Sequence, residues 1–246
     1  MSAAREFDRL SVVLVSTRNP LNIGAVARAM SNFGFFSLRL VNPYEPSFRE
    51  ARSAVGAAEL LASAQEYTSV AEAVAGCTLV VGTTAVHHRD LQHPVHRLES
   101  AAGLIRDNLN SGRVALLFGS EKTGLSNNDL SYCHWLLHIA TEQEHLSMNL
   151  GQAVAVCLHE LARHCETRVT ERPGLSEDAG LANAGELNRL TALWLESLQL
   201  SGYIKRGTEA ACEENLRRML RRLQLHAEDA QLWLGMLRQI VWKLRH

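Results

Sequence analysis

The chain has 246 residues, of which 46% are hydrophobic and 21% charged, and its formal net charge is −1. These values are ordinary for a folded globular protein, and they do not by themselves indicate nucleic-acid binding. No apolar stretch approaches the roughly 18 residues of a membrane helix, and the first ten residues are too charged for a signal peptide, so we expect a cytoplasmic protein without membrane contact.

Apolar runs alternate with helix-like segments through the first two thirds of the chain. The runs predict strands over residues 10–15, 38–41, 78–83, 114–118 and 136–140. Apolar periodicity and alanine content predict helices from about residue 22, over 51–64 and 69–75, and from 149 to 165. Such alternation is typical of an α/β domain with a parallel sheet. We expect one such domain over residues 1–165.

A change of composition separates this domain from the rest of the chain. Residues 166–182 are mostly polar and small and predict a linker. Residues 183–246 predict a small all-helical domain, with helices over 185–201, 208–225 and 227–244. This part carries 10 Lys and Arg against 7 Asp and Glu, whereas residues 1–182 carry 15 against 19. The basic surplus therefore lies at the C-terminal end.

The second of these helices has two contrasting faces. Its leucines and Met219 share one arc, and four arginines occupy the opposite arc: Arg217, Arg218, Arg221 and Arg222. Together with Lys205 and Arg206 in the preceding turn, they predict a phosphate-binding stripe for RNA. The alternative is a solvated face with ion pairs to Glu213 and Glu214.

Three short segments follow strand-like runs and carry the chemistry: residues 22–28 (NIGAVAR), 117–126 (LFGSEKTGLS) and 146–150 (LSMNL). The second is not a phosphate-binding P-loop, because Leu125 follows Gly124 where that loop needs Lys. Its glycines instead allow backbone groups to approach a flat ligand, with an ordinary strand-to-helix turn as the alternative. In the third segment, Ser147 is suited to cap the helix that follows it.

Three residues at the end of the strand over 78–83 should also contribute to the ligand site: Thr83, Thr84 and Ala85. Ligands of parallel sheets bind outside the carboxyl ends of the strands, so all these segments should meet at one edge. A Rossmann-type fold is disfavoured, because the first strand is not followed by a glycine-rich turn.

In this order and at these separations, the three segments resemble the motifs of the SpoU-type RNA 2'-O-methyltransferases of the SPOUT superfamily. The resemblance is strong to about residue 165 and looser in the C-terminal helices. It implies a SPOUT fold with a parallel sheet and a C-terminal trefoil knot, a homodimer, and S-adenosylmethionine as cofactor.

The resemblance also implies roles for individual residues. The cofactor-binding residues would be Thr83, Thr84, Ala85, Leu117, Gly119, Glu121, Gly124, Ile139, Leu146, Ser147 and Met148. Asn22, Ser147 and Asn149 would be catalytic residues. Asn22 would fix the loop or contact the ribose, and Ser147 and Asn149 would lie near the reacting end. Arg28 would be catalytic and bind RNA, holding a phosphate bidentately beside the acceptor ribose. A guanidinium is too weak a base to be an obvious proton acceptor.

The implied reaction is methyl transfer to a ribose 2'-hydroxyl of tRNA, and the tRNA-modifying members of the family suggest nucleotide 32, a cytidine or uridine of the anticodon loop. A target in rRNA or at another tRNA position is the nearest alternative. A non-catalytic RNA-binding knotted protein is the alternative from another class.

No metal site is expected. His87, His88, His93 and His96 crowd one segment, but no carboxylate or thiolate stands at a fitting interval, so RNA contact or a polar lid is the preferred interpretation. His159 and His164 are five residues apart and cannot share a helix face as zinc ligands do. The five cysteines are scattered without a CxxC pair, which fits reduced thiols.

Overall fold

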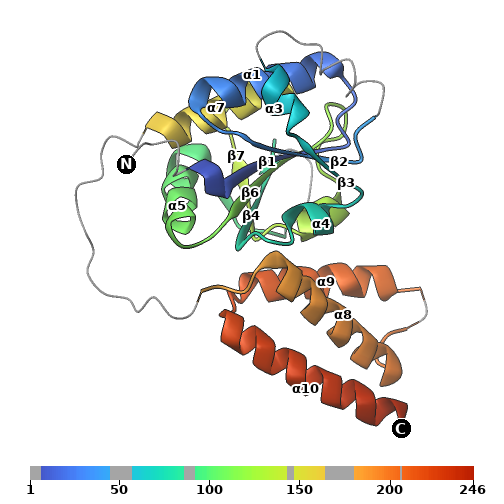
Figure 1. Cartoon of the computed structure of the whole chain (residues 1–246). Coiled ribbons are helices and arrows are strands. Elements are labelled where there is room, and N and C mark those ends of the chain that lie inside the picture. Colours follow the sequence, from blue (N-terminus) through green and yellow to red (C-terminus); the bar gives the residue numbers. More distant parts are fainter. Residues whose placement is uncertain (1–6, 45–56, 86–91, 143–146, 164–179, 206) are drawn as a thin grey trace.

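The computed structural model describes residues 7–44, 57–85, 92–142, 147–163, 180–205 and 207–246. In this part of the chain, a seven-stranded sheet is covered by helices, and three further helices form a second unit beside one face of the sheet (Figure 1). None of the described helices combines the length and apolar character needed to cross a bilayer.

All strand pairings in the sheet are parallel, and the strand order is β3-β2-β1-β6-β4-β7-β5. The central strands β1, β6 and β4 are apolar and buried over most of their length, as expected where helices cover both faces. The strands are β1 Leu10–Val15, β2 Ser37–Val41, β3 Gln65–Tyr67, β4 Leu79–Thr84, β5 Val95–Arg97, β6 Val114–Phe118 and β7 Trp135–His138.

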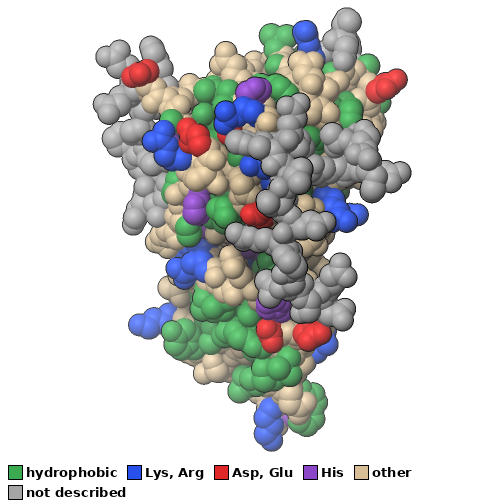
Figure 2. All heavy atoms as spheres, turned by 90° about the vertical axis from the view of Figure 1, so that its left-hand side faces the viewer, with side chains coloured by type: hydrophobic (Ala, Val, Ile, Leu, Met, Phe, Trp, Pro, Cys, Tyr) green, Lys and Arg blue, Asp and Glu red, His purple; other side chains and the backbone are tan. Residues whose placement is uncertain are grey.

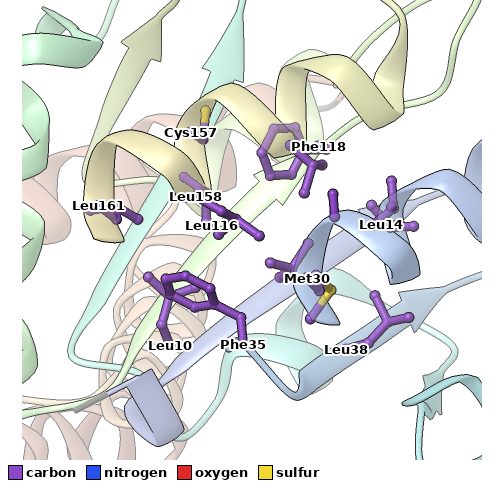
Figure 3. Close-up of a cluster of buried hydrophobic side chains, with 14 of the residues drawn as sticks. Leu10, Leu14, Met30, Phe35, Leu38, Leu116, Phe118, Cys157, Leu158 and Leu161 are labelled. Atoms are coloured by element: carbon purple, nitrogen blue, oxygen red, sulfur yellow. The ribbon is translucent and has the colours of Figure 1, made fainter. Parts of the chain in front are cut away.

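Among the described residues of the sheet unit, a 3-10 helix at Phe7–Arg9 precedes six α-helices: α1 Pro20–Phe33, α3 Ala58–Ala62, α4 Val70–Val74, α5 Leu98–Ser111, α6 Asn127–Ser131 and α7 Leu150–Arg163. Side chains of successive strand residues point to opposite faces and so form two cores. Leu10, Leu14 and Leu116 pack with α1 and α7 on one face, together with Met30, Phe118 and Leu158 (Figure 3). On the other face, Val13 and Leu117 pack against α4 and α6.

The predicted α/β class with a parallel sheet is confirmed, and β1 and β6 have the predicted bounds. Four described strands and α-helices were not predicted: β3, β5, α5 and α6. His96, expected in a loop, lies in β5 and packs edge-on against Trp135. Of the predicted helix over 51–64, only residues 57–64 are described, and α3 covers Ala58–Ala62 of them. The trefoil knot stays a prediction.

The second unit consists of α8 Ala184–Leu200, α9 Glu209–Arg222 and α10 Ala227–Arg245, close to the three predicted helices. Its own core includes Leu190, Leu220 and Leu234, with Trp194 edge-on to Trp233. Figure 2 shows hydrophobic side chains gathered on its surface. The exposed large apolar residues of α10 are Leu232, Met236, Ile240, Trp242 and Leu244. Residues 180–182, expected in a linker, instead bond to the turn before α10.

Two buried arginines of α9, here called the arginine clasp, fasten this unit to the sheet unit. Arg217 donates to Asn128 Oδ1 (3.1 Å) and Ser131 Oγ (2.6 Å), and its guanidinium lies 4.1 Å from the ring centroid of Tyr132. Arg221 donates to the Tyr132 carbonyl (2.8 Å) and to Asn188 Oδ1 (2.9 Å). The first turn of α8 adds bonds from Ala184 and Gly185 to carbonyls of residues 77 and 75.

The clasp corrects the predicted stripe of four arginines. Arg217 and Arg221 are 5% and 1% exposed and are occupied by protein groups, so they do not face solvent with Arg218 and Arg222. Arg217 and Arg221 are instead buried beside Leu216 and Leu220 of the same helix, on the side of α9 that packs against α6. Burial and the neighbouring Arg217 lower the pKa of Arg221 to about 10, because both disfavour the positive charge of its guanidinium.

A histidine next to the clasp predicts acid sensitivity. The Val80 amide donates to His134 Nδ1 (3.0 Å), and burial together with Arg221 lowers the pKa of His134 to about 3. Between pH 6.5 and 3, His134 is therefore protonated in the unfolded chain and neutral in the folded chain. The free energy of unfolding should fall as the pH decreases below about 6.5, by up to about 1.4 kcal/mol per pH unit from this group.

Urea unfolding of the wild type and of His134→Gln between pH 7.5 and 4.5 measures the contribution of His134 to the free energy of unfolding. The variant should show a shallower pH dependence, with the remainder arising from other groups such as His93, whose pKa is lowered to about 4 by burial and nearby arginines. Equal slopes for the two proteins would contradict the assignment to His134.

Candidate active site

A cavity of about 500 Å³ lies outside the carboxyl ends of neighbouring strands. The loops after β4, β6 and β7 line it, together with residues at the start of α1 and α7. Because β1, β6, β4 and β7 are adjacent in the sheet, segments far apart in the sequence meet there. This is the edge at which ligands of parallel sheets bind, as the sequence predicted.

The loop after β6 is folded back tightly on itself. A Cβ atom at Gly119 would lie 2.0 Å from the carbonyl carbon of Gly124, and Gly124 itself has a φ of +65°. The Gly124 amide donates to the Ser120 carbonyl (2.9 Å), and Ser126 then caps α6. Both glycines are thus required by the geometry, and backbone groups of the loop border the cavity.

A chain of side-chain hydrogen bonds joins the three motif segments. Glu121 Oε1 accepts from Asn22 Nδ2 (3.0 Å) and from the Asn19 amide (3.3 Å). Asn22 Oδ1 accepts in turn from Asn149 Nδ2 (2.9 Å), and Asn149 Oδ1 accepts from the Gly151 amide (2.9 Å). This chain, here called the Asn–Glu chain, fixes the amides of Asn22 and Asn149 at the wall of the cavity.

The surroundings of Glu121 keep it ionised. Burial opposes its negative charge, but the bonds from Asn22 and from backbone amides outweigh burial, and the pKa of Glu121 is lowered. Its carboxylate also lies beside the first turn of α1, where the helix dipole favours an anion. Glu121 therefore acts as an acceptor that orients Asn22.

Close packing of two helices supports this arrangement. α1 lies against α7, and a Cβ atom at Gly151 would lie 2.6 Å from the Cβ atom of Ala25. Only glycine allows this approach, which keeps Asn149, just before α7, within reach of Asn22 on α1. The distance between the two helices thus sets the geometry of the site.

Most of the predicted site residues meet at the cavity. Its lining includes the predicted residues Asn22, Thr83, Thr84, Ala85, Gly119, Glu121, Gly124, Ile139, Ser147, Met148 and Asn149. Leu117 does not line it: its side chain lies in the core, and its carbonyl accepts a hydrogen bond from Thr83 Oγ1 (2.9 Å). Leu146 lies outside the described residues, as do Arg206, His87 and His88.

Arg28 is exposed on α1 and is not among the residues that line the cavity. Other lining residues were missed by the sequence reasoning: Phe118, Ser120, Lys122, Thr123, Leu125, Leu130, Leu137, Thr141, Leu150 and Ala153. Ser120, Lys122 and Thr123 stand inside a predicted motif, which was the available signal. Among the described residues, no group of His, Cys, Asp and Glu side chains is arranged to hold a metal ion.

A second cavity, of about 580 Å³, adjoins the first. The two share Asn22, Ser120, Glu121, Lys122 and Thr123, so the Asn–Glu chain forms part of the wall of both. Ser16, Arg18 and Asn19, in the turn after β1, line only the second. Sequence reasoning did not single out this turn.

Comparison with known proteins identifies the family. Residues 9–159 match the model of the SpoU rRNA Methylase family, which is more than half of the chain and spans the sheet and both cavities. The chain belongs to the SpoU methylase family.

Full-length relatives of this SpoU family member are also found. It is similar to the tRNA (cytidine/uridine-2'-O-)-methyltransferase TrmJ of Citrobacter koseri, with 32% identity over 94% of this chain and 96% of that protein. The protein of the same name from Pectobacterium atrosepticum is 30% identical over 95% and 97% of the two chains. The crystal structure of TrmJ from Z. mobilis matches with a TM-score of 0.81 and 30% identity, over 94% of this chain and 98% of that chain.

Proposed function

We propose that this protein is an S-adenosylmethionine-dependent tRNA ribose 2'-O-methyltransferase that modifies nucleotide 32, a cytidine or uridine, in the anticodon loop. Membership of a methylase family and similarity to TrmJ over nearly the whole chain support the reaction and the RNA class. The observation that carries the proposal is the Asn–Glu chain, which brings all three motif segments to one cavity.

The residues of the first cavity fit the proposed cofactor. Apolar side chains of Leu137, Ile139 and Met148 offer a surface for an adenine ring, and Thr83 and Ser147 offer hydroxyl groups. The tight loop at Gly119 brings backbone amides and carbonyls close to the ligand. The cavity volume is in the range of roughly 300 to 1,000 Å³ usual for small-molecule sites. The bound sulfonium would supply an electrophilic methyl group.

The protein's own contribution is mainly alignment. The fixed amides of Asn22 and Asn149 are suited to orient a ribose hydroxyl at the shared wall. Holding two reactants in register contributes about 7 to 11 kcal/mol to such reactions. We retain Arg28 as a phosphate clamp for the RNA. Because it is exposed and does not line the cavity of its own chain, it acts in this proposal on RNA outside that cavity.

The remaining features of the proposal follow the resemblance. We propose that the protein is cytoplasmic, has a trefoil knot and forms a homodimer. Apolar residues exposed on α1 and α7, Leu21 and Val156, support the dimer. We also propose that the helical unit, over about residues 183–246, binds tRNA. Lys205, Arg218 and Arg222 are its candidate contacts, since the clasp residues are engaged by protein.

One observation favours the nearest alternative, an rRNA target. The matching family is described as rRNA methylases, and the matched residues do not include the helical unit. Substrate choice within the family would then depend on the part of the chain outside that match. The similarity to TrmJ, which includes this unit, is the reason for preferring tRNA.

The test is methyl transfer from labelled S-adenosylmethionine to total tRNA and, separately, to rRNA, with mapping of the labelled nucleotide. Label at a ribose of the anticodon loop is expected. Arg28→Ala should lower the rate by about 10²-fold or more, the loss expected when the acceptor ribose is misplaced by about 1 Å, and leave cofactor affinity unchanged. Label only in rRNA would replace the substrate, and cofactor binding without label in either RNA would favour the non-catalytic alternative.

A further inference from the structure

The second cavity has the position that an acceptor site needs. In a methyl transfer, the acceptor oxygen must approach the methyl carbon from the side opposite the departing sulfur. The acceptor nucleotide therefore has to bind next to the cofactor and be separated from it only by the reacting groups. The second cavity meets this condition, because Asn22 and Glu121 belong to the walls of both cavities.

The charges around this cavity favour a phosphodiester. Arg18 and Lys122 line it with their cationic side chains, and Glu121 is the carboxylate among the lining residues. One carboxylate oxygen of Glu121 already accepts from Asn22 and the Asn19 amide, so part of its charge is used within the protein. Hydroxyls of Ser16 and Thr123 add neutral hydrogen-bonding groups. The lining as a whole carries a surplus of positive charge.

We propose that the second cavity binds the acceptor nucleotide of the RNA, with Arg18 and Lys122 holding a phosphate beside the reacting ribose. This inference rests on the proposed methyltransferase function and adds to it the location of the acceptor and two of its ligands. The 2'-oxygen forms the new bond to the methyl carbon as the carbon–sulfur bond breaks. The bonding electrons stay on the sulfur of the resulting thioether, and the hydroxyl proton passes to solvent.

Arg18 and Lys122 are expected to differ in whether they also affect cofactor binding. Lys122 lines both cavities, whereas Arg18 lines only the acceptor side. Arg18→Ala should therefore raise the KM for tRNA about tenfold or more and leave the affinity for S-adenosylhomocysteine within twofold of the wild type. Loss of one phosphate contact should also reduce the salt dependence of RNA binding by about 0.7 in the slope of log K against log salt concentration.

The experiment measures three quantities for each full-length protein: kinetics with tRNA, S-adenosylhomocysteine binding by calorimetry, and RNA binding across a salt series. Arg18→Lys should recover most of the lost affinity because it restores the charge. Arg113→Ala is the matched control. Arg113 is exposed just before β6, at the amino ends of the strands, whereas both cavities lie at the carboxyl ends. Lys122→Ala should weaken RNA binding and show whether the shared wall also affects the cofactor.

A wild-type KM and an unchanged salt slope in both Arg18→Ala and Lys122→Ala would overturn the inference and leave the methyltransferase function intact. A wild-type protein that binds S-adenosylhomocysteine but methylates neither tRNA nor rRNA would reject the proposed function itself, and the acceptor site with it. Equal losses in Arg113→Ala would show that the effect is one of general charge and would also reject the site.

Discussion

Substitution of Gly119 by alanine is expected to weaken cofactor binding and to lower the rate of methyl transfer by about 10²-fold or more. The added methyl group would lie 2.0 Å from the carbonyl carbon of Gly124 and 2.2 Å from the amide nitrogen of Leu125. Both are backbone atoms that no side-chain rotation can move, so the loop has to open. A displacement of about 1 Å at a reacting site lowers rates by roughly 10²-fold, and overpacking costs about 1 to 3 kcal/mol.

Calorimetry with S-adenosylhomocysteine and the methylation assay would measure these losses. Gly103→Ala is the matched control, because a Cβ atom at Gly103 meets no heavy atom within 4 Å and the residue lies inside α5. This control should be slightly more stable than the wild type, by about 0.5 to 1 kcal/mol. Wild-type affinity in Gly119→Ala would show that the loop does not form the cofactor site.

Substitution of Arg221 by alanine is expected to loosen the helical unit from the sheet unit. The change leaves the Tyr132 carbonyl, the Arg217 carbonyl and Asn188 Oδ1 without this donor in a buried region. Each unsatisfied buried group costs about 1 to 3 kcal/mol. Removal of a buried cation beside Arg217 offsets part of this loss. The net destabilisation should be about 2 to 4 kcal/mol.

Thermal unfolding and amide hydrogen exchange would measure the effect, with faster exchange expected in both α9 and α6. Arg222→Ala is the control: the next residue is exposed, and its loss should change stability by less than about 0.5 kcal/mol. If the exchange of α6 is unchanged in Arg221→Ala, the clasp does not hold α6. An equal destabilisation in the two variants would likewise contradict its role.

The strongest periodic signals predicted the elements at the centre of the fold. β1 and β6 are uninterrupted apolar runs buried on both faces, and such runs have clear ends. β3 and β5 are three-residue edge strands of mostly polar residues, none of them buried, so no apolar pattern marks them. α5 was missed although Leu98, Ala101, Ile105 and Leu109 stand at helical spacing and are buried.

The site was predictable as segments, but its internal bonds were not. Glycines and polar residues after strands indicated where a ligand binds, whereas the bond between Asn22 and Asn149 joins residues 127 positions apart. Leu117 was assigned to the cofactor, but neighbouring strand residues face opposite sides, and Phe118 lines the cavity instead. For the arginines of α9, periodicity fixed their position relative to their own helix and could not show that a second unit would cover Arg217 and Arg221.

The strand order has a consequence for how the chain reaches its native state. β1 pairs with β2 a short distance along the chain, but its other neighbour is β6, with Leu10 opposite Val114. β4 likewise has no partner in the sheet before β6 and β7 are available. Contacts between residues so far apart require closing long loops first, which slows folding. During synthesis, the N-terminal strands should therefore remain unpaired on one edge until about half of the protein has left the ribosome.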